Sequence, residues 1–352
     1  MSPSIDTAEP EDVSDYLGTF TRSTQIPGLA VLAVRDGGVV ATGTAGVRKA
    51  GDPRPVTIAD KFHIGSCTKS MTGTLAAILV SDGLIHWQAT VAEVFPDSEI
   101  HPGYRAATLL QMASNSGGVP GSPPPELWRT MMINRTKPVA EERVAFIHAV
   151  LAAPPAYPPG GGRVYANGGF TIAGSMLERV SGRSYEQLLR ERLFAPLQMD
   201  SAGFGCAASP DAVDQPWGHR VRNGPAEPVT PGPFADNPPA IAPAGRVHLN
   251  AFDFAKYANL HLGQLANAPL DGDSLRFLHT AVPPGDSYGI GWVIQEGGKV
   301  IWHNGSNTMN HALIWLRPEQ NFGALVLCNS GAERARGIGN EVVDFLAREF
   351  LA

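Results

Sequence analysis

The chain has 352 residues, of which 43% are hydrophobic, so it is long enough to bury a large core in one domain or two. Its formal net charge of −6 provides no basic surface for nucleic acid, and no apolar run is long enough to span a membrane. We therefore expect a protein that binds no nucleic acid and has no membrane span.

The amino terminus and the cysteines bear on the cellular compartment. Residues 1–6 lack a basic stretch followed by an apolar one, so no leader is visible. A cytoplasmic protein is expected as the sequence stands, and a periplasmic or secreted one if a leader was removed. Cys67, Cys206 and Cys328 cannot all pair with one another and lack metal-ligand spacing, so free thiols are expected. Neither a metal nor a cofactor is expected.

The first elements in chain order are a short helix at 11–20 and two strands at 28–34 and 39–45. Asp36-Gly-Gly38 between the strands is a hairpin signal. The first strand is apolar on both faces, which predicts a position inside a sheet that is covered on both sides. A helix is then expected from about residue 66 to residue 81.

Helical segments dominate the middle of the chain, at 106–114, 139–152, 168–180 and 185–194, with proline-rich loops at 154–162 and 224–245. The chain then continues with a helix at 251–262, strands at 300–305, 312–317 and 323–329, and a last helix at 332–351.

This order predicts an α/β (α+β) fold with one central antiparallel sheet, which is built from both chain ends and flanked by helices. A mainly helical lobe is inserted between the two halves of the sheet. The expected domains are 1–83 together with 245–352 for the sheet, and 84–244 for the lobe. Sheet and lobe should meet in a cleft, where functional sites tend to lie.

The stretch from His63 to Leu75 reads as a glycine turn that runs into a buried helix. Gly65 permits a backbone conformation that other residues resist. Lys69 follows Ser66 by three residues, so on a helix the two lie one turn apart on the same face. A serine hydroxyl needs a base to take its proton, and a lysine can do so only when neutral, which burial favours. The alternative is a helix-capping Ser66 beside a solvated Lys69.

A second candidate element is Tyr165-Ala-Asn167, which follows a proline- and glycine-rich loop. A phenol near a lysine and a serine can relay protons, and its pKa falls when a cation is nearby. Asn167 offers an amide donor for a substrate carbonyl. The alternative is a buried tyrosine and an asparagine that caps the next helix.

A third candidate element is His303-Asn-Gly-Ser306, at the end of a late strand. Gly305 permits close approach, so the N–H groups of Ser66 and Ser306 are expected to form an oxyanion hole. His303 would face the cleft as a hydrogen-bond donor or cation. The alternative is a histidine at a strand end with no further role.

The chain resembles the penicillin-recognising serine hydrolases in the order of its three motifs, which are Ser-x-x-Lys, Tyr-x-Asn and His-x-Gly. These hydrolases include class C β-lactamases, D-alanyl-D-alanine carboxypeptidases and β-lactamase-like carboxylesterases. The resemblance covers nearly the whole chain. Other stretches that carry it are Tyr165 to Gly182, Leu193-Phe-Ala-Pro-Leu-Gln-Met199, Pro243-Ala-Gly-Arg246 and Tyr288-Gly-Ile-Gly-Trp292.

The resemblance implies a role for each candidate residue. Ser66 would be the acylated nucleophile and Lys69 its base. Tyr165 would pass the proton to the leaving group and activate the deacylating water, while Asn167 orients the acyl side chain. His303 would take the place of the lysine in the Lys-Thr-Gly motif of class C β-lactamases.

The departures from the family pattern bear on the substrate. His303 lacks the permanent charge that helps to hold a β-lactam carboxylate, and Asn304 stands where threonine is common. Asn115 replaces a frequent histidine, and Arg246 replaces a glycine. The segment 123–132 is rich in apolar groups, which either overhang the cleft as an acyl pocket or form part of the lobe's core.

The resulting expectation is a serine hydrolase acting through a Ser66 acyl-enzyme, as a carboxylesterase on small or medium acyl esters. The alternatives are a D-amino-acid-specific peptidase or amidase and a class C-like β-lactamase. A more remote alternative is a non-catalytic binding protein with a vestigial site. The partner expected is a small-molecule ester, amide or β-lactam, and the oligomeric state stays open.

Overall fold

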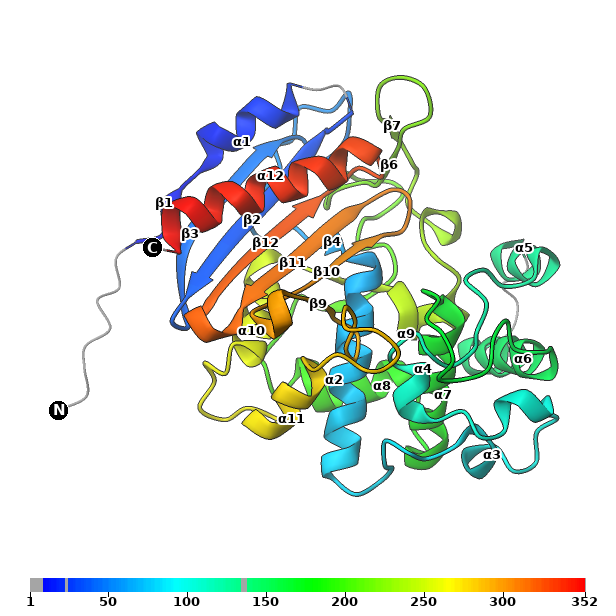
Figure 1. Ribbon diagram of the computed structural model, residues 1–352. Helices are drawn as coiled ribbons and strands as arrows, with labels where there is room; N and C mark the ends of the chain where they lie inside the picture. Colours follow the sequence, from blue (N-terminus) through cyan, green and yellow to red (C-terminus); the bar gives the residue numbers. More distant parts are fainter. Residues whose placement is uncertain (1–8, 23–24, 134–137, 352) are drawn as a thin grey trace.

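A computed structural model describes residues 9–22, 25–133 and 138–351 of the chain (Figure 1). Residues 1–6, on which the expectation about a leader rests, lie outside the described residues. Every helix within the described ranges is too short or too polar to cross a bilayer.

A large sheet is assembled from both ends of the chain, as expected. Within the described residues it has seven strands in the order β1-β3-β2-β12-β11-β10-β9. Neighbours pair antiparallel, except that β1 runs parallel to β3. The strands are β1 (Glu11–Asp12), β2 (Gly28–Arg35), β3 (Gly38–Gly46), β9 (Val293–Gln295), β10 (Val300–Ser306), β11 (His311–Arg317) and β12 (Phe322–Cys328).

The parallel strand β1 corrects the expectation of a purely antiparallel sheet. Residues 11–12 were expected in the first helix, but they pair with Ala41 and Thr42 of β3. The helix α1 (Ser14–Thr21) begins later, because Asp12 accepts a hydrogen bond from the Ser14 N–H at 2.9 Å and ends the extended segment.

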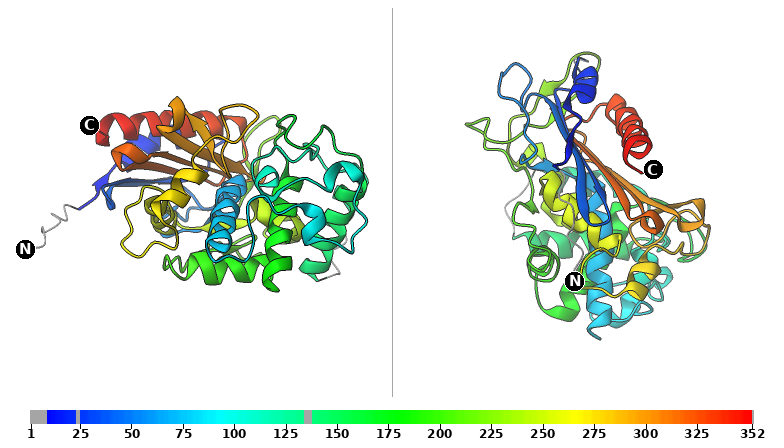
Figure 2. Two further views of the ribbon diagram at one scale, coloured as in Figure 1. Left: turned by 60° about the horizontal axis from the view of Figure 1, so that its bottom comes forward. Right: turned by 90° about the vertical axis from the view of Figure 1, so that its left-hand side faces the viewer.

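Strand β2 joins the two chain ends, because it pairs with β3 on one side and with β12 on the other. Its side chains alternate between two apolar cores, with Leu32 on one face and Val31 on the other. The helices α1 and α12 (Glu333–Phe350) cover the second face, and α2 (Thr68–Ser81) and α10 (Ala251–His261) the first (Figures 1 and 2). This confirms the expectation that β2 lies inside a sheet that is covered on both sides.

The middle of the chain is mainly helical and packs below the sheet around α2 (Figure 1). Its helices are α3 (Val91–Val94), α4 (Leu109–Met112), α5 (Pro125–Ile133), α6 (Val139–Ala152), α7 (Asn167–Ser181), α8 (Tyr185–Leu189) and α9 (Ala242–Gly245), and α11 (Gly272–Leu278) follows α10. Three short strands, β5 (Gly203–Phe204), β6 (His219–Arg220) and β7 (Glu227–Pro228), also lie in this region, where none was expected. The boundaries at 83/84 and 244/245 stay a prediction.

Two expected helices differ in extent. The segment expected at 106–114 is helical only over α4, since Thr108 and Gln111 cap its start and Asn115 adopts a positive φ of 60° soon after its end. The segment expected at 185–194 is α8 followed by a wider π-helical turn, Arg190–Phe194.

Candidate active site

Ser66 lies on a 3-10 turn, Gly65–Cys67, that leads directly into α2. Gly65 has a φ of +50°, and a Cβ there would lie 2.3 Å from the backbone nitrogen of Ser306. Because no side chain fits that space, the turn requires glycine. The expected helix start is therefore a tighter turn, which places Ser66 against β10.

Lys69 is fully buried one turn after Ser66. Its Nζ lies 3.0 Å from Ser66 Oγ, and it donates to Asn167 Oδ1 at 2.7 Å and to the carbonyl of Ala244 at 2.8 Å. Burial lowers the pKa of this lysine to about 7, so a large share of the amine is neutral near neutral pH. The solvated lysine of the alternative interpretation is thus not what the structure shows.

Asn167 is the first residue of α7 and does not cap it, because the preceding Ala166 occupies the N-cap position. Its side-chain oxygen instead accepts from Lys69, which fixes the amine beside Ser66. The structure thus connects Asn167 with the base. Its expected contact with an acyl side chain stays a prediction.

Tyr165 lies at the rim of the site, with 46% of its surface exposed. Its ring centre is 4.6 Å from Lys69 Nζ, and its hydroxyl interacts with Ser66. The hydroxyl end is enclosed, and burial raises the pKa of Tyr165 well above its ordinary value. The expected fall in this pKa is therefore wrong: Tyr165 is a neutral phenol that can donate and accept a proton.

The backbone around Gly305 completes the constellation. A Cβ on Gly305 would lie 2.5 Å from the nitrogen of Ser66 and 2.0 Å from the carbonyl oxygen of Ile64. Strand β10 therefore lies directly against the Ser66 turn, and the N–H groups of Ser66 and Ser306 come from adjoining backbone segments. An oxyanion hole formed by these two N–H groups stays a prediction.

The comparisons with known proteins agree with this geometry. A sequence model of the Beta-lactamase family matches residues 13–348. The chain belongs to this family. The resemblance inferred from the motifs is thus confirmed, and so is the α/β fold with its helical lobe.

Individual relatives of this Beta-lactamase family member are distant. A Beta-lactamase of Escherichia coli (strain K12) is 27% identical over 232 residues, covering 64% of this chain and 56% of that protein. Protein flp of Staphylococcus aureus (strain NCTC 8325 / PS 47) is 23% identical over 323 residues, covering 88% of this chain and 60% of that protein. The chain thus spans less than two thirds of the length of these relatives.

Solved structures show the same fold. The octameric penicillin-binding protein homologue from Pyrococcus abyssi superposes with a TM-score of 0.77 at 24% identity, covering 95% of this chain and 76% of that one. SurE superposes with a TM-score of 0.75 at 22% identity, covering 96% and 75%. A structure of SurE with D-Leu gives a TM-score of 0.73 at 22% identity, covering 95% and 75%.

Of the two roles expected for His303, hydrogen-bond donor or cation, the structure contradicts the cation. The ring is buried, its Nδ1 lies 2.5 Å from the carbonyl oxygen of Asn304, and its Nε2 lies 3.2 Å from the hydroxyl of Tyr288. Burial, assisted by the charge of Lys69, lowers the pKa of His303 to about 3. His303 is therefore neutral at physiological pH, and it supports the strand beside the site without adding charge.

Some residues that shape the site were missed from the sequence. Asn115 accepts the Ala166 N–H on its side chain at 3.1 Å and the Tyr157 hydroxyl on its backbone oxygen at 2.9 Å, so it holds the Tyr165 loop. The backbone carbonyl of Ala244 binds Lys69. The only sequence signal for Asn115 was that asparagine is unusual at this position. The Ala244 carbonyl leaves no sequence signal, because every residue has a backbone carbonyl.

Two further expectations concern neighbouring side chains. All three cysteines are free thiols, and Cys67 is buried with its sulfur 3.3 Å from the carbonyl of His303, so burial raises its thiol pKa. A buried thiol with a raised pKa is a poor candidate for a nucleophile. Of the apolar segment 123–132, Met131 is buried and Trp128 packs against the main core, which favours the core interpretation over an acyl pocket.

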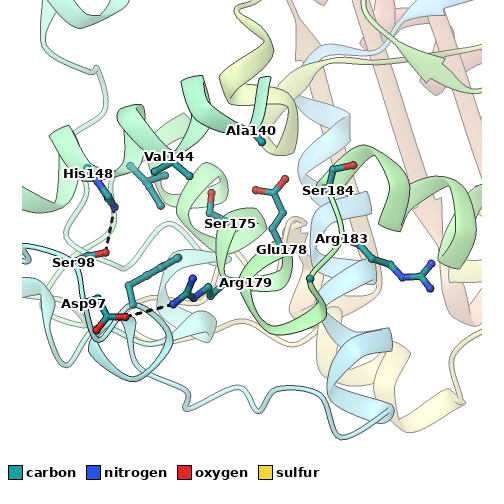
Figure 3. Close-up of a pocket in the computed structure, with 13 residues that line it drawn as sticks. Asp97, Ser98, Ala140, Val144, His148, Ser175, Glu178, Arg179, Arg183 and Ser184 are labelled. Carbon is teal, nitrogen blue, oxygen red and sulfur yellow. Dashed lines mark hydrogen bonds and ion pairs between the residues drawn. The ribbon is translucent and has the colours of Figure 1, made fainter. Parts of the chain in front are cut away.

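A cavity of about 550 Å³ lies away from Ser66, in the helical lobe between α6 and α7 (Figure 3). Its lining includes Val144 and Ile147 of α6 and Glu178 and Arg179 of α7. It contains none of the candidate catalytic residues. Over the described ranges, no cluster of three or more His, Cys, Asp or Glu side chains is arranged to hold a metal ion.

Proposed function

We propose that this protein is a serine hydrolase that forms an acyl-enzyme on Ser66, with carboxylic esters of small or medium acyl chains as substrates. The supporting observation is the buried amine of Lys69, which lies 3.0 Å from Ser66 Oγ and has a pKa lowered to about 7. A neutral amine at hydrogen-bond distance is what a serine needs to become a nucleophile.

In the proposed acylation step, Ser66 Oγ attacks the substrate carbonyl carbon and its proton passes to the neutral Lys69. The negative charge that develops on the carbonyl oxygen is stabilised by the N–H groups of Ser66 and Ser306. Tyr165 delivers a proton to the leaving alkoxide and recovers one from Lys69, so an alcohol departs. The product of this step is an ester of Ser66 with the acyl group.

In the proposed deacylation step, water attacks the Ser66 ester from the side that the alcohol has left. Tyr165 accepts the water proton as the new bond forms while it passes its own hydroxyl proton to the neutral Lys69 amine, and Lys69 returns a proton to Ser66 Oγ when the carboxylic acid departs. Tyr165 suits this role because part of its ring faces solvent while its hydroxyl faces Ser66.

The neutral His303 supports esters over substrates that carry a carboxylate. A buried imidazole with a pKa of about 3 provides no cation for a carboxylate group, whereas an ester needs none. The departure from lysine at this position therefore lowers the expected affinity for β-lactams more than the expected rate of acyl transfer.

A D-amino-acid-specific peptidase or amidase is the second candidate, because a cation lies elsewhere near the site. Burial raises the pKa of Tyr165, and the charge of Arg336 on α12 acts against this rise, so Arg336 is within electrostatic reach of the phenol. Within the described part of the chain, Arg336 is exposed and makes no ion pair. It is suited to a terminal carboxylate, and the structural neighbour SurE was solved with D-Leu.

Parallel kinetics on p-nitrophenyl esters, nitrocefin and D-alanyl peptides would test the proposal. We expect kcat/KM to be highest for short esters. A tenfold or greater preference for the peptide, lost in Arg336→Ala, would establish the second candidate instead. Labelling with a fluorophosphonate should modify Ser66, and a folded protein that neither labels nor hydrolyses any of these substrates would be the non-catalytic binding protein.

A further inference from the structure

We propose that His63, Asp236 and Arg246 act together as positioning residues for Ser66. The three side chains form a buried chain of contacts, called here the His63 brace, behind the turn that carries the nucleophile. The inference rests on the proposed acyl-enzyme chemistry. It adds residues that touch neither the substrate nor the reacting atoms.

The brace begins at the backbone of the turn itself. The N–H of Gly65 donates to Nδ1 of His63 at 3.0 Å, so this nitrogen carries no proton. On the other side of the ring, Nε2 lies 2.7 Å from Oδ1 of Asp236. Through the hydrogen bond from the Gly65 N–H, His63 fixes Gly65, whose positive φ brings Ser66 against Ser306.

Asp236 connects His63 with a second segment of the site. Its Oδ2 accepts from Nε of Arg246 at 2.8 Å, and only 2% of its surface is exposed. Burial alone would raise the pKa of this carboxyl, but His63 and Arg246 outweigh it and hold the pKa below its ordinary value. Asp236 is therefore ionised, and it orients both partners through charge-assisted contacts.

Arg246 follows α9, the short helix whose Ala244 carbonyl receives the Lys69 amine. The neighbouring Asn237 reinforces this connection, since its side-chain amide donates to the carbonyl of Gly245 at 2.7 Å. The brace thus ties together the segment that presents the Ser66 N–H and the segment that holds Lys69. This accounts for Arg246 at a position where relatives have glycine.

The geometry requires a brace, because the two segments meet closely. A Cβ on Gly245 would lie 3.5 Å from the carbonyl group of Gly65, so the end of α9 packs directly on the Ser66 turn. A misplacement of about 1 Å in such a constellation costs on the order of a hundredfold in rate. Loosening the brace should therefore slow acylation more than it weakens substrate binding.

The test compares fluorophosphonate labelling of Ser66 in wild type, His63→Leu and His63→Asn, with the maximal labelling rate separated from the half-saturating concentration. His63→Leu removes the acceptor for the Gly65 N–H and should lower the maximal rate by roughly ten- to a hundredfold, with the half-saturating concentration nearly unchanged. In His63→Asn, the amide oxygen stands where Nδ1 stood but the contact with Asp236 is lost, so part of the rate should return.

Asp82→Asn is the matched control, because it weakens an ion pair with Arg192 at the end of α2 that lies opposite to Ser66. It should lower the melting temperature without changing the labelling rate. If His63→Leu does not fold, the nearly isosteric Asp236→Asn takes its place, and it should slow labelling likewise.

Two results would overturn the brace. The first is a His63→Leu protein, or the Asp236→Asn protein in its place, that labels within twofold of the wild-type rate. The second is a His63→Asn protein that labels as slowly as His63→Leu. A wild-type protein that never labels on Ser66 is a different outcome, since it would refute the proposed acyl-enzyme itself.

Discussion

The amine of Lys69 lies closer to the side-chain oxygen of Asn167, at 2.7 Å, than to the hydroxyl of Ser66, at 3.0 Å. The neutral amide of Asn167 accepts a hydrogen bond from the amine without adding a negative charge beside it. It therefore positions the base while leaving the effect of burial on its pKa intact. An aspartate there would also accept the bond, but its charge would stabilise the protonated amine.

The first prediction is the pH dependence of the wild-type enzyme. Lys69 acts as a base only when neutral, and burial lowers its pKa to about 7. The value of kcat/KM for a p-nitrophenyl ester should therefore rise from pH 5 to pH 9, with a one-proton midpoint near that pKa. A rate that is flat across pH 6 to 8 would contradict Lys69 as the base.

The second prediction is that Asn167→Asp moves this midpoint upward. A carboxylate at hydrogen-bond distance favours the charged amine and should raise the Lys69 pKa by roughly 1–3 units. Activity should fall at pH 7 and recover in part at pH 9. Asn167→Leu serves as the control, since it removes the acceptor without adding charge and should give no upward shift.

The third prediction concerns Lys69 and Tyr165 as one relay. Lys69→Ala and Tyr165→Phe should each lower kcat by about a thousandfold or more, and the double variant should lose little beyond either single one. The measurement is steady-state kinetics on proteins whose circular dichroism matches wild type. Losses that multiply would mean that the two groups act independently.

The fourth prediction is that Gly65→Ala abolishes the oxyanion arrangement. The new Cβ would lie 2.3 Å from the nitrogen of Ser306, so the turn and β10 must separate. Loss of one donor typically costs about a hundred- to a thousandfold in kcat. Gly83→Ala is the matched control: Gly83 also has a positive φ, of +73°, but a Cβ there meets nothing within 4 Å. It should lose stability and keep its kcat.

The fifth prediction is a loss of stability in mild acid. In the described part of the chain, burial lowers the pKa of several histidines, to about 4 for His219, His248 and His311, to about 3 for His279 and His303, and well below the ordinary value for His261. The unfolded chain binds protons at these groups from about pH 6.5 downward, while the folded chain does not.

Stability should therefore be complete above about pH 6.5 and fall as the pH drops, by up to about 1.4 kcal/mol per pH unit for each such histidine. Urea unfolding at pH 7, 6 and 5 measures the effect. His279→Gln should flatten the slope, because it removes one of these groups. The exposed His86 provides the comparison, and His86→Asn should leave the slope unchanged.

Local signals explain what could be predicted. Ser66 and Lys69 are three residues apart, on a 3-10 turn and on the helix α2 that continues it, so a contact one turn apart could be predicted from the spacing. Strand β2 is a continuous apolar run, which predicted its burial. Strand β1 has two residues and no apolar pattern. Its pairing with β3 depends on tertiary contacts, so it could not be predicted from the local sequence.

The remainder of the site depends on contacts between distant loops. The carbonyl that binds Lys69 belongs to Ala244, and any residue there would offer the same atom. Asn115 stood out only as an unusual residue, and its bond to the Tyr165 loop spans 51 positions. The neutrality of His303 follows from its burial beside Tyr288, which the sequence does not reveal. These features need the folded chain.

The pairing of β2 with β12 joins segments that are made far apart in time during synthesis. Residues 28–35 leave the ribosome early, yet the strand that completes their side of the sheet lies at 322–328. The backbone of Ser306, which lies against the Ser66 turn, belongs to the same late part of the chain. On the proposed function, a nascent chain would carry an inert serine until the newest strands close the sheet.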